Sequence, residues 1–283
     1  MTRVRQIVRF MKELEAGFDR TTLPLPATTV FLKADSEITG TTVPFEIEVD
    51  EDDSDDTHPS LPWMWRGTSE STATRSYPAR TKAHSRGSLV HPIAHRAISF
   101  ASTFELACAM MLSANRRIAL VEDQPAAVLH TRPDGTHEHT FDYRATLQNG
   151  YRVAIAVRPS WLIEKDNLSD TIHRIRSGFL AGFADEAVIL TERQLTRARG
   201  WNAQTILLAI RNSAAADNDR LRDFAFRFQG TVAIRTLIDI FDTPAAGWNA
   251  VWCLVYQGTL IPARPDMKLI DAPFVSFNHH TLH

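Results

Sequence analysis

The stretch FDYRATLQNGYRVAIAVRPS, residues 141–160, has the pattern of two strands joined by a turn. Apolar and β-branched residues flank the sequence QNG, which favours an antiparallel hairpin. The first strand is expected to run from the RPDG turn at 132–135 to Leu147. An acid, Asp142, lies on the first strand of the hairpin, and a cation, Arg158, ends the second. Because the strands are antiparallel, these two charges are expected at the same end of a sheet.

The segments around this hairpin predict a mixed sheet flanked by helices. Residues 99–115 carry apolar side chains at helical spacing, and residues 118–131 offer two short strands around a proline. Residues 166–183 are expected to form a helix, and residues 187–190 a buried strand. This order of elements is typical of an α/β domain. We assign the domain to residues 86–192.

The rest of the chain differs in composition from this domain. Residues 193–283 predict three helices, at 195–212, 219–230 and 231–242, followed by a further apolar helix and a short hairpin. Together these favour a winged-helix-like, mainly helical module. Residues 1–50 are expected to form an amphipathic helix and a hairpin. Residues 51–85 have the composition of a linker or a long surface loop, first acidic and then basic.

Composition limits the class of protein. With 283 residues, 44% of them hydrophobic, the chain can bury a substantial core. The net charge of -2 argues against a uniformly basic nucleic-acid binder, although acids concentrate in 50–56 and bases in 66–96. Two cysteines, Cys108 and Cys253, lie in apolar patterns without metal-site spacing. No apolar run approaches the roughly 18 residues of a membrane span, so we expect a cytoplasmic protein without a membrane partner.

Two further polar residues are expected to lie near Asp142 and Arg158. Glu105 is on the helix that precedes the sheet, and Gln124 follows a strand in the sequence VEDQP. The stretches SFASTFELACAMML, VEDQPAAVLHTRPDGTHEHTFDYRATLQNGYRVAIAVRPS and VILTERQLTRARGWNAQTIL resemble the TnsA-like endonuclease subunits of heteromeric transposition systems. These subunits belong to the PD-(D/E)XK superfamily, whose fold is restriction-endonuclease-like. The resemblance covers residues 86–206 well and the C-terminal module loosely.

The resemblance implies an active site and a metal cofactor. Glu105, Gln124, Asp142 and Arg158 would be the catalytic residues, with Glu105 and Asp142 holding Mg²⁺ or Mn²⁺. Two positions depart from the family pattern: Ala156 replaces an acid or Gln, and Arg158 replaces a Lys. Arg158 keeps the positive charge but cannot release a proton near neutral pH. A reduced site with weaker metal binding is therefore expected.

The resemblance also implies a function and partners. The chain would cut one strand of DNA at the ends of a mobile element, together with a DDE transposase subunit and an AAA+ ATPase regulator. One alternative is a catalytically inactive subunit that binds DNA and docks partners. Another is an accessory factor of a phage or mobile element that acts on DNA ends without transposition.

Two groups of arginines and the basic segment 66–96 are candidate phosphate contacts, and the alternative for them is a solvated basic face. The arginine groups are Arg193, Arg197 and Arg199, and Arg220, Arg222 and Arg227.

Each candidate residue also has an ordinary structural explanation. Glu105 can be a solvated charge on a helix, and Asp142 can be an ion-pair partner of Arg144 or Arg158. Gln124 with Pro125 can simply end a strand. The residues His137 and His139 share one face of a strand, where they can bind a transition metal or form a solvated edge. The order and spacing of the four site residues favour the site over these separate explanations.

Overall fold

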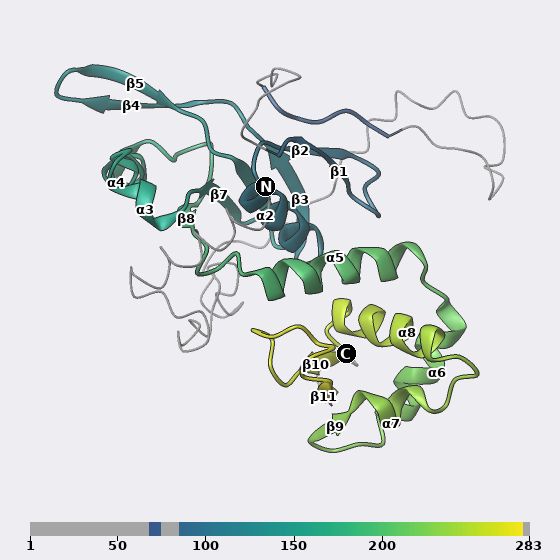
Figure 1. The fold of residues 1–283 in the computed structure, drawn as a ribbon. Coiled ribbons are helices and arrows are strands. Elements are labelled where there is room, and N and C mark those ends of the chain that lie inside the picture. The colour runs from purple at the N-terminus through teal and green to yellow at the C-terminus, as the bar shows by residue number, and fades with distance from the viewer. Residues whose placement is uncertain (1–67, 75–84, 280–283) are drawn as a thin grey trace, which may run out of the picture.

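The computed structural model describes residues 68–74 and 85–279 (Figure 1). Its centre is a four-stranded sheet with the order β3-β6-β7-β8. The strands are β3 (Ile118–Asp123), β6 (Tyr143–Leu147), β7 (Arg152–Val157) and β8 (Glu186–Leu190). The first three pair antiparallel, and β8 pairs parallel to β7. The predicted mixed sheet is thus confirmed.

Helices cover both faces of this sheet. One face packs against α2 (Thr103–Ser113), and the other packs against α4 (Leu168–Gly178), which follows the short α3 (Ser160–Ile163). Side chains of β7 alternate between these faces because the side-chain period of a strand is two. Val153, Ile155 and Val157 join the core under α2, whereas Ala154 and Ala156 join the core under α4.

The expected single strand from 135 to 147 is divided in two. Residues after the RPDG turn form β5 (Gly135–His139), which pairs only with β4 (Val128–Arg132). The chain then bends at residues 140–142, where Phe141 turns its ring into the core under α4. Figure 1 shows the β4-β5 hairpin projecting beyond the sheet, close to α4. A hydrogen bond of 2.6 Å from Arg132 to the Thr171 hydroxyl connects the hairpin to that helix.

A second small sheet precedes α2. It contains β1 (Gly87–Val90) and β2 (Ala97–Phe100), paired antiparallel. Residues 68–74, which fall within the predicted linker, contact this region: Ser69 bridges to Arg96. The predicted N-terminal helix and hairpin lie outside the described residues.

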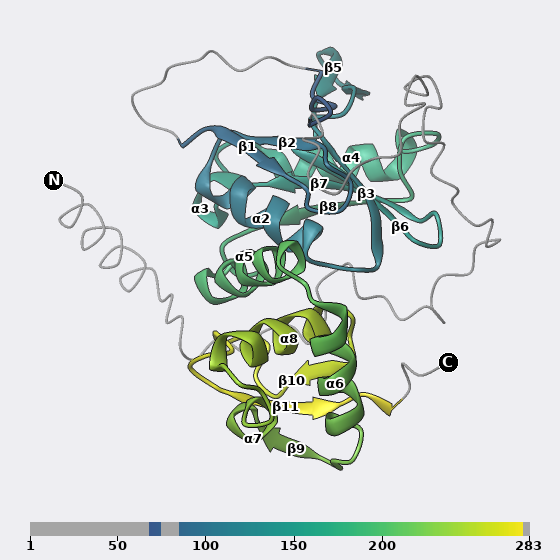
Figure 2. The ribbon, with the colours of Figure 1, turned by 90° about the vertical axis from the view of Figure 1, so that its right-hand side faces the viewer.

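The chain continues after the sheet domain into a mainly helical part with its own core. The long helix α5 (Arg197–Arg211) lies against α2 on one side and against this part on the other (Figure 2). The further helices are α6 (Ala215–Ala225), α7 (Ile234–Ile238) and α8 (Pro244–Tyr256). Three short strands form an antiparallel sheet in the order β10-β11-β9: β9 (Thr231–Ala233), β10 (Leu260–Pro262) and β11 (Phe274–Phe277).

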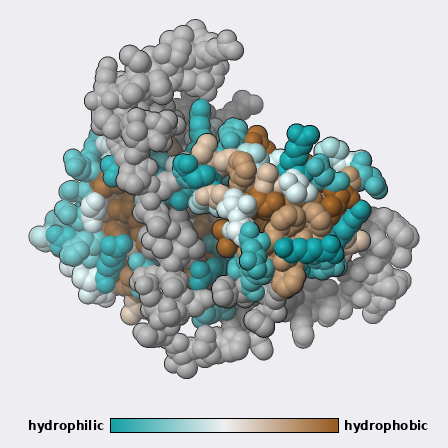
Figure 3. Space-filling view, turned by 90° about the horizontal axis from the view of Figure 1, so that it is seen from below, coloured by the Kyte–Doolittle hydropathy of each residue, from teal (hydrophilic) through white to brown (hydrophobic). Residues whose placement is uncertain are grey.

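One feature of this part was not expected from the sequence. The segment 231–242, predicted as one helix, begins with strand β9 because it pairs with β11. The predicted apolar helix is α8, which carries no charged residue and packs against α5, α6 and α7. Six of its residues are buried: Gly247, Ala250, Val251, Trp252, Cys253 and Leu254. Figure 3, which shows the molecule from below, has apolar residues exposed among hydrophilic ones on this face. Among the described helices, none has both the length and the apolar character needed to cross a membrane.

Candidate active site

The backbone at the start of β6 fixes Asp142 at one end of the sheet. Its N–H donates to the Ile155 carbonyl oxygen over 2.9 Å, and its own carbonyl oxygen accepts from the Gln124 N–H over 2.9 Å. The Asp142 carboxylate accepts from the Val157 N–H over 2.6 Å. The side chain is half-buried, and the hydrogen bond from Val157 fixes its orientation at the strand end.

Glu105 approaches the same place from helix α2. The helix begins with Ser102, whose hydroxyl accepts from the Glu105 N–H over 3.1 Å, while the Glu105 carboxylate accepts from the Ala101 N–H over 2.7 Å. This reciprocal arrangement resembles a capping box and fixes the first turn of the helix. Tyr143, next to Asp142, donates its hydroxyl to the Glu105 carbonyl oxygen over 3.2 Å. The helix start is thereby tied to strand β6.

The two carboxylates influence each other electrostatically. Burial and the charge of Glu105 raise the pKa of Asp142 to about 7, against the hydrogen bond from Val157 and the charge of Arg158, which lower it. The thiol of Cys108, one turn beyond Glu105 on α2, is buried beside the pair, and burial together with both carboxylates raises its pKa well above its usual range. The thiol therefore stays protonated, and the acidic pair is the reactive feature of this site.

Arg158 lies near Asp142, as the sequence predicted, but it is also engaged elsewhere. Its charge lowers the pKa of Asp142, and its Nε atom lies 3.0 Å from a carboxylate oxygen of Asp166. The side chain is about half exposed, at 49%. The backbone N–H of Arg158 donates to the Leu190 carbonyl oxygen, which extends the pairing of β7 with β8. A solvent-facing cation of this kind can exchange an acid partner for a phosphate.

Ala156 occupies the position at which the resemblance would place a further acid or amide. Asp142 donates to Ile155 and accepts from Val157, so its hydrogen bonds flank Ala156 on the neighbouring strand. The Ala156 side chain is 3% exposed and belongs to the apolar core under α4. This position supplies no carboxylate, and the site is limited to the pair from α2 and β6.

Gln124 adjoins the site through its backbone. It takes the left-handed conformation with a φ of 41°, a strained geometry for a residue with a side chain. Its carbonyl oxygen accepts from Thr74, which connects the residue to the segment 68–74. The side-chain Oε1 atom is buried and has no hydrogen-bond partner among the described residues. Strain and an unsatisfied buried oxygen are features that cluster at functional sites.

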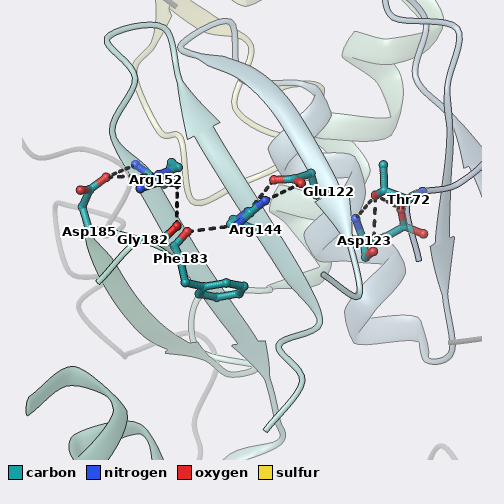
Figure 4. A network of polar contacts seen from close by, with 8 residues as sticks. All are labelled: Thr72, Glu122, Asp123, Arg144, Arg152, Gly182, Phe183 and Asp185. Carbon is teal, nitrogen blue, oxygen red and sulfur yellow. Dashed lines mark hydrogen bonds and ion pairs between the residues drawn. The ribbon is translucent and has the colours of Figure 1, made fainter. Parts of the chain in front are cut away.

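Sequence reasoning missed the neighbouring residue, Asp123, which is fully buried. Its two carboxylate oxygens accept from the Thr72 N–H over 3.1 Å, the Thr72 hydroxyl over 2.9 Å and the Ser99 N–H over 2.7 Å, and also from the Ser71 hydroxyl. Figure 4 shows the contacts with Thr72. Asp123 therefore holds residues 68–74 onto the sheet. The sequence holds one signal for this burial, the alternation of side chains along a strand. Val121 and Asp123 lie two residues apart on β3, and both are buried.

Arg144 pairs with Glu122, so the explanation of Asp142 as an ion-pair partner of Arg144 is wrong. The guanidinium donates to both Glu122 carboxylate oxygens, over 2.6 and 2.7 Å, and to the Phe183 carbonyl oxygen over 3.1 Å (Figure 4). These two residues face each other in the β3-β6 register. The charged side chains that act on Asp142 are therefore those of Glu105 and Arg158.

The histidines lie on the β4-β5 hairpin, which is paired separately from the four-stranded sheet. His137 and His139 share a face of the hairpin with His130, whose ring stacks on that of His137 at 5.9 Å. His137 contacts Asp134 at 3.0 Å, and the His139 ring packs edge-on against Phe141. Within residues 68–74 and 85–279, no group of three or more His, Cys, Asp or Glu has the arrangement of a metal site.

The candidate phosphate contacts are of two kinds. Four of the predicted arginines are exposed: Arg193, Arg197, Arg220 and Arg227. Of these, Arg220 also lies over the Phe241 ring, 5.4 Å from its centroid. The other two are less exposed and donate hydrogen bonds within the protein. Arg199 is partly buried, which lowers its pKa, and donates to the Gln194 carbonyl oxygen. Arg222 contacts Asp219 and Gln257. The exposed four are distributed between the sheet domain and the helical part.

The residues present fit a divalent cation of the Mg²⁺ type. Such ions need only one or two protein carboxylates, with water and phosphate oxygens completing the shell. Burial and the charge of Glu105 both raise the pKa of Asp142, and a bound cation would offset these two costs of the ionised acid. No protein-family model matches the chain, and no curated protein is significantly similar to it.

Proposed function

We propose that the protein is a metal-dependent DNA endonuclease with a reduced active site. The observation that carries this proposal is the carboxylate pair: Asp142 is fixed by the Val157 N–H, lies beside Glu105, and has a pKa of about 7. An acid whose pKa is raised by burial and by the charge of a neighbouring carboxylate is typical of functional sites. The place of the two acids at one end of a mixed sheet agrees with the resemblance to TnsA-like subunits.

The residues have separate roles in this proposal. Asp142 and Glu105 would hold the cation, which when bound polarises the phosphodiester and lowers the pKa of a water molecule. Arg158 would leave Asp166 and stabilise negative charge on the phosphate, since a guanidinium can do this without losing a proton. The unpartnered Oε1 atom of Gln124 would accept a hydrogen bond at the edge of the site. Ala156 contributes no ligand, so we expect slow turnover.

The proposed role in transposition rests on the resemblance to TnsA-like subunits. We propose a subunit that cuts DNA at the ends of a mobile element, in company with a DDE transposase subunit and an AAA+ ATPase. The order of elements from α6 to β11, helix, strand, two helices and two strands, supports a winged-helix-like module. Helix α8 is uncharged and buried, however, so DNA contact by this module would have to use other elements.

Plasmid nicking tests the proposed activity. Supercoiled plasmid is incubated with the full-length protein and Mg²⁺ or Mn²⁺, alone and with a transposase partner. The wild-type protein is expected to nick in a metal-dependent manner. The Asp142→Asn variant, which keeps the hydrogen bond to Val157 but loses the charge, is expected to be slower by about 100-fold or more. Glu138→Gln, at an exposed acid on β5, serves as the matched control and should leave the rate unchanged. Equal nicking by wild type and Asp142→Asn would contradict the proposal.

A second candidate function is a catalytically silent subunit that binds DNA and docks partners. The burial of Ala156 in the apolar core favours it, because an apolar side chain fills the position at which the resemblance would place a further metal ligand. This candidate predicts salt-sensitive DNA binding by the wild-type protein without nicking in either metal. Nicking that depends on Asp142 would exclude it.

A further inference from the structure

Tyr143 is the first residue of β6 and directly follows Asp142. Its side chain is fully buried, and its ring belongs to the core under α2. A tyrosine hydroxyl in such a place needs a hydrogen-bond partner, because burial of a polar group without one is costly. The partners of this hydroxyl therefore show which part of the chain is fixed to the strand end beside Asp142.

The Tyr143 hydroxyl reaches two backbone carbonyl oxygens of the β2–α2 turn, residues 99–105. It donates toward the Ser99 carbonyl oxygen over 3.1 Å and toward the Glu105 carbonyl oxygen over 3.2 Å. A single hydroxyl proton can be shared between two acceptors at such distances. Tyr143 thus contacts this turn at its first residue and at the residue that carries the second acid of the candidate site.

Other hydrogen bonds make the β2–α2 turn a rigid unit. The Glu105 carboxylate accepts from the Ala101 N–H over 2.7 Å, so the side chain of this acid is fixed to the turn itself. The Ser99 N–H donates over 2.7 Å to the buried carboxylate of Asp123 on β3. The turn is therefore attached to β3 through Asp123 and to β6 through Tyr143.

The separation of the two acids depends on the attachment through Tyr143. The backbone and carboxylate of Asp142 are fixed to β7 by hydrogen bonds to Ile155 and Val157, whereas Glu105 is fixed to the β2–α2 turn. We propose that Tyr143 is a positioning residue that holds Glu105 at the distance from Asp142 at which both carboxylates bind one divalent ion.

This inference rests on the proposed function and adds to it a determinant of metal affinity. The Tyr143 hydroxyl itself does not bind the ion, because it is buried and directed to the two carbonyl oxygens. Its effect on the ion passes through the position of Glu105.

Isothermal titration of Mn²⁺ into the full-length, metal-free protein tests this role. Tyr143→Phe keeps the ring in the core and removes only the hydroxyl. This variant is expected to bind Mn²⁺ about 10-fold more weakly than the wild type, because residues behind the ligands of a metal fix the geometry of those ligands. Tyr151→Phe is the matched control. It removes a hydroxyl that donates to Glu186 over 3.2 Å just before the start of β7, and it should bind Mn²⁺ as the wild type does.

The pKa of Asp142 gives a second measurement, one that a general loss of stability would not change. The charge of Glu105 contributes to the raised pKa of Asp142. Once Glu105 is no longer held in place, its charge acts on Asp142 from a greater average distance, so the pKa of Asp142 should fall in Tyr143→Phe. An NMR titration of the aspartate carboxyl carbons without metal measures this pKa, and Tyr151→Phe should show the wild-type value.

The possible results separate this inference from the proposed function. Mn²⁺ binding that is lost in Asp142→Asn but normal in Tyr143→Phe would overturn the positioning role and leave the metal site standing. Equal losses in Tyr143→Phe and Tyr151→Phe would also overturn the role, since the effect would then be one of general stability. An unchanged pKa of Asp142 in Tyr143→Phe would contradict the fixed separation of the two acids. Failure of the wild type to bind Mn²⁺ would overturn both the inference and the metal-dependent function.

Discussion

At about pH 8 without metal, the Asp142→Asn variant is expected to be more stable toward urea than the wild-type protein, with the difference shrinking at about pH 5. The folded state raises the pKa of Asp142 to about 7, whereas the unfolded chain has the ordinary value near 3.9. The folded state therefore prefers the protonated acid. Stability from this group is fully present below about pH 4 and is lost as the pH rises toward 7.

The size of this effect follows from the difference in the pKa of Asp142 between the folded and the unfolded state. Between about pH 5 and pH 8 the free energy of unfolding of the wild type should fall by roughly 2–3 kcal/mol relative to Asp142→Asn. The asparagine can still accept from the Val157 N–H, so the comparison isolates the charge. Glu138→Gln, at an exposed acid on β5, should show no such dependence. A pH-independent difference between wild type and Asp142→Asn would mean that folding does not raise the pKa of Asp142.

Replacing Asp123 by Asn is expected to have the second large effect, a loss of about 3 kcal/mol in the free energy of unfolding. The buried carboxylate accepts from Thr72, Ser99 and Ser71, and an amide would turn its NH₂ group toward some of these donors. Urea unfolding measures the loss. Hydrogen exchange at the Thr72 and Ser99 amides should show local release of residues 68–74 at lower free energy than global unfolding.

The neighbouring Glu122→Gln variant is the control for Asp123→Asn. Glu122 pairs with Arg144 on a partly exposed face, so this change should cost about 1 kcal/mol or less. If Asp123→Asn were no more destabilising than Glu122→Gln, the buried acid would not be what holds residues 68–74 on the sheet.

Local patterns were sufficient for the mixed sheet and its helices. The apolar spacing of 99–115 and the alternation around the QNG turn are properties of neighbouring residues, and both predict the observed elements. The approach of Glu105 to Asp142 was expected from the resemblance, and the electrostatic coupling of the two acids agrees with it.

Long-range contacts decided the features that local patterns missed. Asp123 is buried because its partners come from residues 71, 72 and 99, far away in the sequence. The strand predicted from 135 to 147 breaks because Phe141 finds a place in the core under α4, which no local pattern reveals. Strand β9 forms within a predicted helix because β11 pairs with it.

Isothermal titration of Mg²⁺ and Mn²⁺ into the metal-free protein measures metal binding by Asp142 and Glu105 without requiring catalysis. The wild type is expected to bind a divalent ion and, near pH 7, to release part of a proton from Asp142, which appears as a dependence of the heat on the buffer. Asp142→Asn and Glu105→Gln should each weaken binding by about 10-fold or more, while Glu138→Gln binds as the wild type does. Failure of the wild type to bind either ion, or equal binding by all four proteins, would contradict a metal site at Asp142 and Glu105.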